Sequence, residues 1–258
     1  MKLRYLLMSA AVLTSTAGAA LGPIVANADG ATYTDETHVT TKGSINFTKD
    51  DTPVDPVDPD DPDNPIDPVD PDNPSGAELM INYASNLNFG TQSKSDLSWN
   101  AYADKINDPE NKGATKDIVP FVSVKDSQGS DRTGWNLTVK QDGDFKNGET
   151  VLKGAVLKFS GLHYAAGDLM PTATAGDIAL SSEAQTIASA DAEHGAGNTS
   201  LALGSLQEET EKSVDENGEA TETKVQKTVG VNLSVPSGTV INTGTYSTSV
   251  TYELTAGV

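Results

Sequence analysis

Two short sequence patterns each place an aromatic residue and a leucine two positions apart. The first is Trp135-Asn136-Leu137, and the second, near the C-terminus, is Tyr252-Glu253-Leu254. Because alternate side chains of a β-strand leave the same face, each pattern puts an aromatic ring beside a leucine. This arrangement indicates either a binding surface or the inward face of an ordinary strand, since apolar side chains prefer the interior. The pattern alone leaves both interpretations open.

Residue types that perform catalysis or bind metals do not occur in recognisable arrangements. The histidines His38, His163 and His194 have no His or Cys neighbour at ligand spacing, which argues against a zinc site. The stretch 142–149 is superficially like a calcium loop, but Lys146 stands where an oxygen ligand is needed, so we expect a tight turn. The sequence has no nucleophile elbow, phosphate loop or dinucleotide fingerprint. We therefore expect a non-catalytic protein without metal or cofactor.

The elements that would position these residues are β-strands. Segments rich in Val, Thr, Tyr and Leu, separated by Gly, Asn and Asp, predict strands at 78–83, 119–124, 134–141, 155–160, 201–204, 225–235 and 245–255. Short strands with turn signals between them predict a mainly β fold, an antiparallel β-sandwich. One short helix is expected at 95–105, capped by Ser95 or Asp96. The charged stretch 207–224, with a turn at 215–218, predicts an exposed hairpin or loop.

An Asp-Pro tract precedes the predicted sandwich. Proline recurs at every third residue from Pro53 to Pro74, and ten aspartates lie between Asp50 and Asp72 with no basic residue. Three residues per turn is the period of polyproline II, and like charges stiffen a chain. At about 3.1 Å per residue, the tract 50–75 predicts an extended spacer of roughly 70 Å. A PxxP ligand or a calcium-binding acidic tract is the functional alternative.

The N-terminal region predicts export. A basic start, a short apolar run and the Ala26-Asn27-Ala28 site are typical of a signal peptide over residues 1–28, so we expect the mature chain to begin at Asp29. The polar segment 29–49 contains one strand-like run, Gly43-Ser44-Ile45-Asn46-Phe47. This segment is either a disordered tip or a strand added to the main domain, which we place at 76–258.

Composition limits the partners. The chain has no cysteine, so its stability comes from a hydrophobic core rather than from disulfides. The formal net charge of −20 argues against binding to nucleic acid or to anionic lipid. No second long apolar segment predicts membrane insertion, and no sortase-type LPxTG motif follows. We therefore expect a secreted protein that is retained at a cell surface by non-covalent contact.

Taken together in their order along the chain, several of these segments resemble the WxL-domain surface proteins of Gram-positive bacteria of the lactobacillus and enterococcus type. The similar segments are the 43–47 run, the Asp-Pro tract, 78–83, Leu87-Asn88-Phe89-Gly90, 119–126 and 134–139. The resemblance implies a C-terminal module that binds peptidoglycan non-covalently and holds the protein at the bacterial cell wall. It also implies other WxL proteins, a membrane-anchored partner protein or host matrix proteins as alternative partners in surface complexes or adhesion.

The resemblance also assigns candidate site residues. It carries the first motif to Trp135 and Leu137 and the second to Tyr252 and Leu254, where tyrosine replaces the tryptophan usual in the family. Tyrosine keeps an aromatic face and adds a hydroxyl group. Wall binding would then consist of aromatic stacking on sugar rings, with Asn136 and nearby threonines making polar contacts. The competing interpretation places Trp135 in the core and wall binding elsewhere.

Overall fold

The computed structural model describes residues 32–33, 35–48, 52–129, 132–214 and 220–257. The chain divides into two units, Met1–Lys49 and Asp50–Val258. The predicted signal peptide and the predicted turn at 215–218 lie outside the described residues. In the first unit, β1 (Thr32–Tyr33) pairs antiparallel with β2 (Val39–Thr40). The strand-like run 43–47 does not form a strand, and the side chains of Ile45 and Phe47 are exposed.

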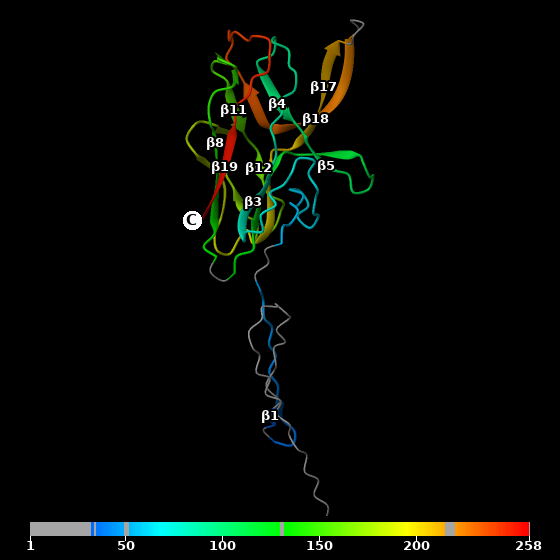
Figure 1. Cartoon of the computed structure of the whole chain (residues 1–258), viewed down its shortest axis with the longest axis vertical. Helices are drawn as coiled ribbons and strands as arrows, with labels where there is room; N and C mark the ends of the chain where they lie inside the picture. The colour runs from blue at the N-terminus through cyan, green and yellow to red at the C-terminus, as the bar shows by residue number, and fades with distance from the viewer. Residues whose placement is uncertain (1–31, 34, 49–51, 130–131, 215–219, 258) are drawn as a thin grey trace, which may run out of the picture. The chain divides into compact units, whose positions relative to one another are not determined.

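In its described part, the second unit consists of antiparallel strands in three main sheets and two small ribbons (Figure 1). The motif sheet has the order β13 (Thr172–Ala173), β15 (Gln185–Ala190), β8 (Trp135–Gln141), β19 (Val250–Ala256). The covered sheet has the order β12 (Leu162–His163), β16 (Gly197–Leu203), β7 (Phe121–Asp126), β3 (Leu79–Ala84). The hairpin sheet has the order β14 (Ile178–Ala179), β11 (Val156–Phe159), β18 (Ala220–Ser234), β17 (Leu206–Val214), and β4 (Ser98–Tyr102) also pairs with β18. The ribbons are β5 (Asp104–Asn107) with β6 (Thr115–Ile118) and β9 (Lys146–Asn147) with β10 (Thr150–Val151).

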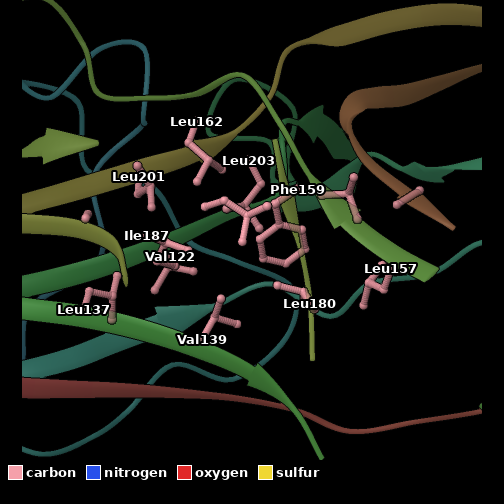
Figure 2. Close-up of a cluster of buried hydrophobic side chains, with 14 of the residues drawn as sticks. Val122, Leu137, Val139, Leu157, Phe159, Leu162, Leu180, Ile187, Leu201 and Leu203 are labelled. Atoms are coloured by element: carbon pink, nitrogen blue, oxygen red, sulfur yellow. The ribbon is translucent and has the colours of Figure 1, made fainter. Parts of the chain in front are cut away.

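One hydrophobic core joins the three sheets. Strand β8 alternates buried and half-buried residues along its whole length, as expected for a strand with one face inward. Figure 2 shows its Leu137 and Val139 in one cluster with Val122 of β7, Leu201 of β16 and Phe159 of β11. The predicted mainly β sandwich is therefore confirmed, and every predicted strand is present with shifted ends.

The helix predicted at 95–105 is wrong. This segment forms β4 and the start of β5. The described residues contain no helix, and therefore no helix that is long and apolar enough to cross a membrane. The reason is tertiary pairing, which overrides a weak local preference. Strand β18 lies next to β4, with Leu233 opposite Trp99 and Thr228 opposite Ala101, and Ala101 is completely buried.

The Asp-Pro tract is not an extended spacer. Its described part, residues 52–75, belongs to the second unit and is called the strap below. The strap doubles back on itself, because Asp58 N–H donates to the Asn64 carbonyl at 3.0 Å and Val57 forms an isolated bridge with Pro65. The side chains of Val57 and Ile66 are buried. Apolar anchoring therefore outweighs the mutual repulsion of the aspartates.

The strap lies against the outer face of the covered sheet. Because proline has no N–H group, such a segment offers mainly carbonyl acceptors, and the sheet presents side-chain donors to it. The donors and acceptors are Lys125 Nζ to the Thr52 carbonyl (3.1 Å), Asn82 Nδ2 to Val54 (3.4 Å), Asn198 Nδ2 to Asp55 (3.2 Å) and Ser200 Oγ to Val57 (2.6 Å). Both faces of β7 are thus covered, which explains why all six of its residues are buried.

A second apolar cluster fixes the far end of the strap. Ile66 packs with Tyr83 and Phe121 of the covered sheet and with Ile106 and Ile118 of the β5–β6 ribbon. The rings of Tyr83 and Phe121 lie 4.8 Å apart. This packing holds the strap and the β5–β6 ribbon against the covered sheet.

Candidate functional site

The two sequence motifs, more than a hundred residues apart in the chain, lie on neighbouring strands. Strands β8 and β19 run antiparallel, with Leu137 opposite Leu254, Val139 opposite Tyr252 and Trp135 opposite Ala256. The structure therefore brings the predicted site residues together in one part of the motif sheet.

Trp135 is a core residue. Its relative exposure is 0%, it lies between Ala190 of β15 and Ala256 of β19, and Leu137 is equally buried. A Cβ atom at Gly195, which has a positive φ of 71°, would come within 3.2 Å of the Trp135 ring. The indole N–H is buried without a hydrogen-bond partner. Of the two interpretations of the motif, the structure favours the inward face of a strand, and Trp135 offers no surface on which a sugar can stack.

Tyr252 and Leu254 are half-buried, in contrast to the first motif. The Tyr252 hydroxyl oxygen is buried without a hydrogen-bond partner, and burial raises the pKa of Tyr252 above its ordinary value. The phenol therefore stays neutral at physiological pH. A neutral hydroxyl with no internal partner is available to bond a group that enters beside it.

The outer face of the motif sheet carries the polar residue of the first motif. Asn136 lies between Ser189 of β15 and Thr255 of β19, and the next row across the strands is formed by Thr186, Thr138 and Glu253. Directly opposite residues share a face. These rows form a surface of hydroxyl, amide and carboxylate groups on the face of the sheet opposite to the buried side chains of Trp135 and Leu137.

A cavity of about 310 Å³ adjoins the half-buried motif residue. Tyr252 lines it with Phe89 and Phe145, and the polar lining comes from Ser85, Asn86, Thr248 and Ser249. This volume is near the lower limit of small-molecule sites, which combine an apolar lining with a few polar groups. Sequence analysis missed Phe145, although an isolated aromatic residue in the polar stretch 142–149 was a usable signal. The predicted tight turn there is confirmed, since β9 and β10 form a hairpin with Gly148 at φ 56°.

A larger cleft of about 810 Å³ lies on the hairpin sheet. It is formed by the segment 91–100, which includes Trp99 of β4, and by the β17–β18 hairpin, which projects from the other strands in Figure 1. The Trp99 side chain is half-buried, and its indole N–H is buried without a hydrogen-bond partner. The second tryptophan of the chain thus lines an open polar site.

A charged network forms one wall of this cleft. Lys227 Nζ lies 2.7 Å from Glu211 Oε1, 3.5 Å from Glu209 Oε2 and 4.8 Å from the centre of the Tyr102 ring. Asn100 Nδ2 donates to Glu209 Oε1 at 2.8 Å, and the Tyr102 hydroxyl donates to Glu211. The hydrogen bonds of Asn100 and Tyr102 with the two glutamates each join residues 109 positions apart, so no local sequence signal identifies them.

The network keeps the Glu211 carboxylate ionised. Burial acts to raise the pKa of Glu211, but hydrogen bonds from Lys227 and Tyr102 and the charge of Lys227 outweigh it and hold the pKa below its ordinary value. Burial and the same hydrogen bond raise the pKa of Tyr102. The cleft therefore presents a fixed, ionised Glu211 carboxylate at neutral pH.

Metal ligands are not assembled in the part of the chain that the structure describes. There, no three His, Cys, Asp or Glu side chains come together in an arrangement that could hold a metal ion. The three histidines are far apart in sequence, and each contacts one aspartate: His38 with Asp35, His163 with Asp60 and His194 with Asp191.

Comparison with known proteins identifies one family. The family model described as "WxL domain surface cell wall-binding" matches residues 34–257, so the match begins directly after β1 and includes nearly all of the second unit. No curated protein and no solved structure matches the chain. Since the match includes the motif sheet, the strap and the hairpin sheet, the chain belongs to the WxL-domain family of cell-wall-binding surface proteins.

Proposed function

We propose that this protein is exported, has no catalytic activity and attaches to peptidoglycan by non-covalent contact. The observation that carries the proposal is the family match over residues 34–257, since a cell-wall-binding surface domain accounts for nearly all of the chain outside the predicted signal peptide. The net charge of −20 argues against general electrostatic adhesion to an anionic wall, so attachment requires specific contacts.

The motif residues divide into two roles in this proposal. Trp135 and Leu137 hold β8 in the core and thereby fix the position of β19. The groups that contact the wall are the outward Asn136 and Thr255 and the cavity residue Tyr252. Hydrogen bonds made on an open surface contribute little net free energy, so the cavity, which excludes water from one side of a bound group, supplies the stronger contact.

Sedimentation with purified sacculi tests the proposal. Mature protein is mixed with Gram-positive sacculi from which proteins and teichoic acids have been removed, and we expect it in the pellet. A double variant, Asn136→Ala with Thr255→Ala, should pellet less than the wild type. The control is Thr186→Ala, on the same sheet but outside the proposed wall contacts, and it should pellet as the wild type does. Wild-type protein that stays in the supernatant would overturn the proposal.

A partner surface protein is a second candidate for the attachment. Among the described strands, β19 is at the end of the motif sheet and pairs with β8 alone. An edge strand with free backbone groups can accept a strand from another protein. Capture of the domain by a membrane-anchored surface protein, with sacculi as the competing ligand, separates the candidates: capture that sacculi do not reduce favours the partner.

A further inference from the structure

Strand β19 forms a long edge of the motif sheet whose backbone groups are half used. Among the described strands it pairs with β8 alone, over seven residues. Asp142 N–H donates to the Ser249 carbonyl at one end of this pairing, and Gly257 N–H donates to the Gly134 carbonyl at the other. Because bonded pairs of an antiparallel ladder recur at every second residue, residues 250, 252, 254 and 256 turn their N–H and C=O groups to the outer edge.

The side chains along this edge are incompletely covered. Val250, Tyr252 and Leu254 pack against the hydrophobic core but remain half-buried, and the residues that alternate with them, 251, 253 and 255, are exposed. A strand with one apolar and one polar face, laid along β19, would cover the apolar side chains and leave the polar ones in water.

The other ends of the three main sheets oppose strand addition. Asn73 of the strap covers β3, because its backbone N–H donates to the Asn82 carbonyl at 2.7 Å and its Nδ2 donates to the Ile81 carbonyl at 2.9 Å. Strand β17 carries three glutamates, and β12, β13 and β14 have two residues each. Charged or very short edge strands accept a further strand poorly. Strand β19, with one charged residue, is therefore the best acceptor.

The N-terminal unit contains a segment with the matching pattern. Residues 43–48 form no strand, and Ile45 and Phe47 are 77% and 83% exposed. The residues that alternate with them, Ser44, Asn46 and Thr48, are polar. In an extended conformation the two apolar side chains share one face and the three polar side chains the other. Covering the apolar pair would remove a large apolar surface from water.

We propose that residues 43–48 of one copy of this chain add as a strand to the β19 edge of a second copy. Ile45 and Phe47 then lie beside Tyr252 and Leu254 on the inner face of the motif sheet. The occupant is a second copy because a single chain leaves both apolar side chains exposed. Donor and acceptor are different surfaces, so the contact is head-to-tail and can extend into longer assemblies. This self-association goes beyond the proposed wall attachment.

Light scattering of the full mature chain over a range of concentrations tests the association. We expect the mean mass to rise above that of a monomer as the concentration rises. Phe47→Asp should weaken the association at least about tenfold, because it places an unpaired charge on the face that becomes buried. Val240→Asp is the matched control: Val240 is 80% exposed and belongs to neither surface, so this variant should associate as the wild type does.

A labelled synthetic peptide of residues 40–48 tests the acceptor edge. It should bind saturably to the full mature Phe47→Asp chain, whose own segment is a poor donor. Adding Ala256→Pro to that chain should weaken the binding, since proline removes an N–H that faces the outer edge and takes no bond from β8. The Ala256 side chain is exposed, so the exchange leaves the core packing in place. A urea midpoint close to that of the parent shows that the variant is folded.

Hydrogen exchange identifies which edge is used. Association should slow exchange in residues 43–48 and in β19. A chain that stays monomeric at its highest soluble concentration, equal association by Phe47→Asp, or slowed exchange at another edge in place of β19 would each overturn the proposal. All of these measurements are made without sacculi. A monomeric chain that still sediments with sacculi contradicts self-association alone, whereas an associating chain that stays in the supernatant contradicts the proposed function alone.

Discussion

The two tryptophans of the chain occupy opposite environments. Trp135, in the family motif, is completely buried between neighbouring strands of the motif sheet, whereas Trp99, outside the motif, lines a polar cleft on the hairpin sheet. Both indole N–H groups are buried without a hydrogen-bond partner, and both side chains contact the hydrophobic core. The comparison teaches that a motif residue can characterise a family through its place in the core of the fold.

The largest expected difference between the two regions is in stability. Trp135→Ala should lower the free energy of unfolding by about 3–5 kcal/mol, because it leaves a cavity in a close-packed core. Trp99→Ala should lower it by less than about 2 kcal/mol, since that side chain is only half-buried. Urea unfolding followed by circular dichroism measures both. Equal losses would remove the distinction between a core and a cleft tryptophan.

The next effect concerns the ammonium group in the cleft. Lys227→Met removes the cation shared by Glu209 and Glu211 and leaves their charges facing each other, so we expect a loss of about 1–3 kcal/mol, reduced by partial exposure of the carboxylates. Lys224→Met is the matched control on the same strand, because its ion pair with Glu208 is exposed and its removal should leave the urea midpoint unchanged. If Lys227→Met leaves the free energy of unfolding unchanged, the network does not hold the cleft in shape.

A pH effect should follow from the same network. Because the folded-state pKa of Glu211 lies below its ordinary value of 4.5, this carboxylate stabilises the fold above that value and loses its contribution as the pH falls through the lower, folded-state pKa. The stability difference between wild type and Glu211→Gln should therefore be constant near neutral pH and shrink in acid below 4.5. A difference that grows in acid would contradict the sign of the shift. Urea midpoints measured over this pH range provide the test.

The smallest stability effect is expected at the second motif. Tyr252→Phe removes a buried hydroxyl that has no partner in the protein, so stability should stay constant or rise by up to about 1 kcal/mol. The same variant should sediment less well with sacculi if the hydroxyl bonds the wall. A clear loss of stability would mean that the hydroxyl has an internal role, and Tyr83→Phe, which loses a 2.6 Å hydrogen bond to Asp104, shows the size of such a loss.

Local sequence patterns predicted the parts of the fold that depend on local alternation. The period of two in β8 and the Val-rich and Thr-rich runs identified the strands, and the similar motif segments identified the family. The helix at 95–105 was wrong because pairing of β4 with β18, more than a hundred residues away, decides its conformation. In the Asp-Pro tract, the period of three predicted an extended conformation from the spacing of the prolines alone. The burial of Val57 and Ile66 decides instead where the tract packs.

The candidate site was less predictable than the fold. Sequence spacing placed Trp135 and Leu137 on one face, but both core and surface strands have that spacing, and only the three-dimensional packing shows which is present. The Trp99 cleft joins β4 to the β17–β18 hairpin, and its charged network connects residues such as Asn100 and Glu209. Long-range contacts of this kind have no local signature in a single sequence.

Acrylamide quenching of two single-tryptophan variants tests most directly whether the motif tryptophan is a core residue or a wall contact. Trp135→Phe leaves Trp99 as the reporter, and Trp99→Phe leaves Trp135. We predict that Trp135 is shielded from acrylamide both in the free protein and with soluble peptidoglycan fragments bound, while the half-buried Trp99 is quenched more strongly. If instead Trp135 is quenched in the free protein and becomes shielded when the fragments bind, Trp135 is a contact residue and its assignment to the core is contradicted.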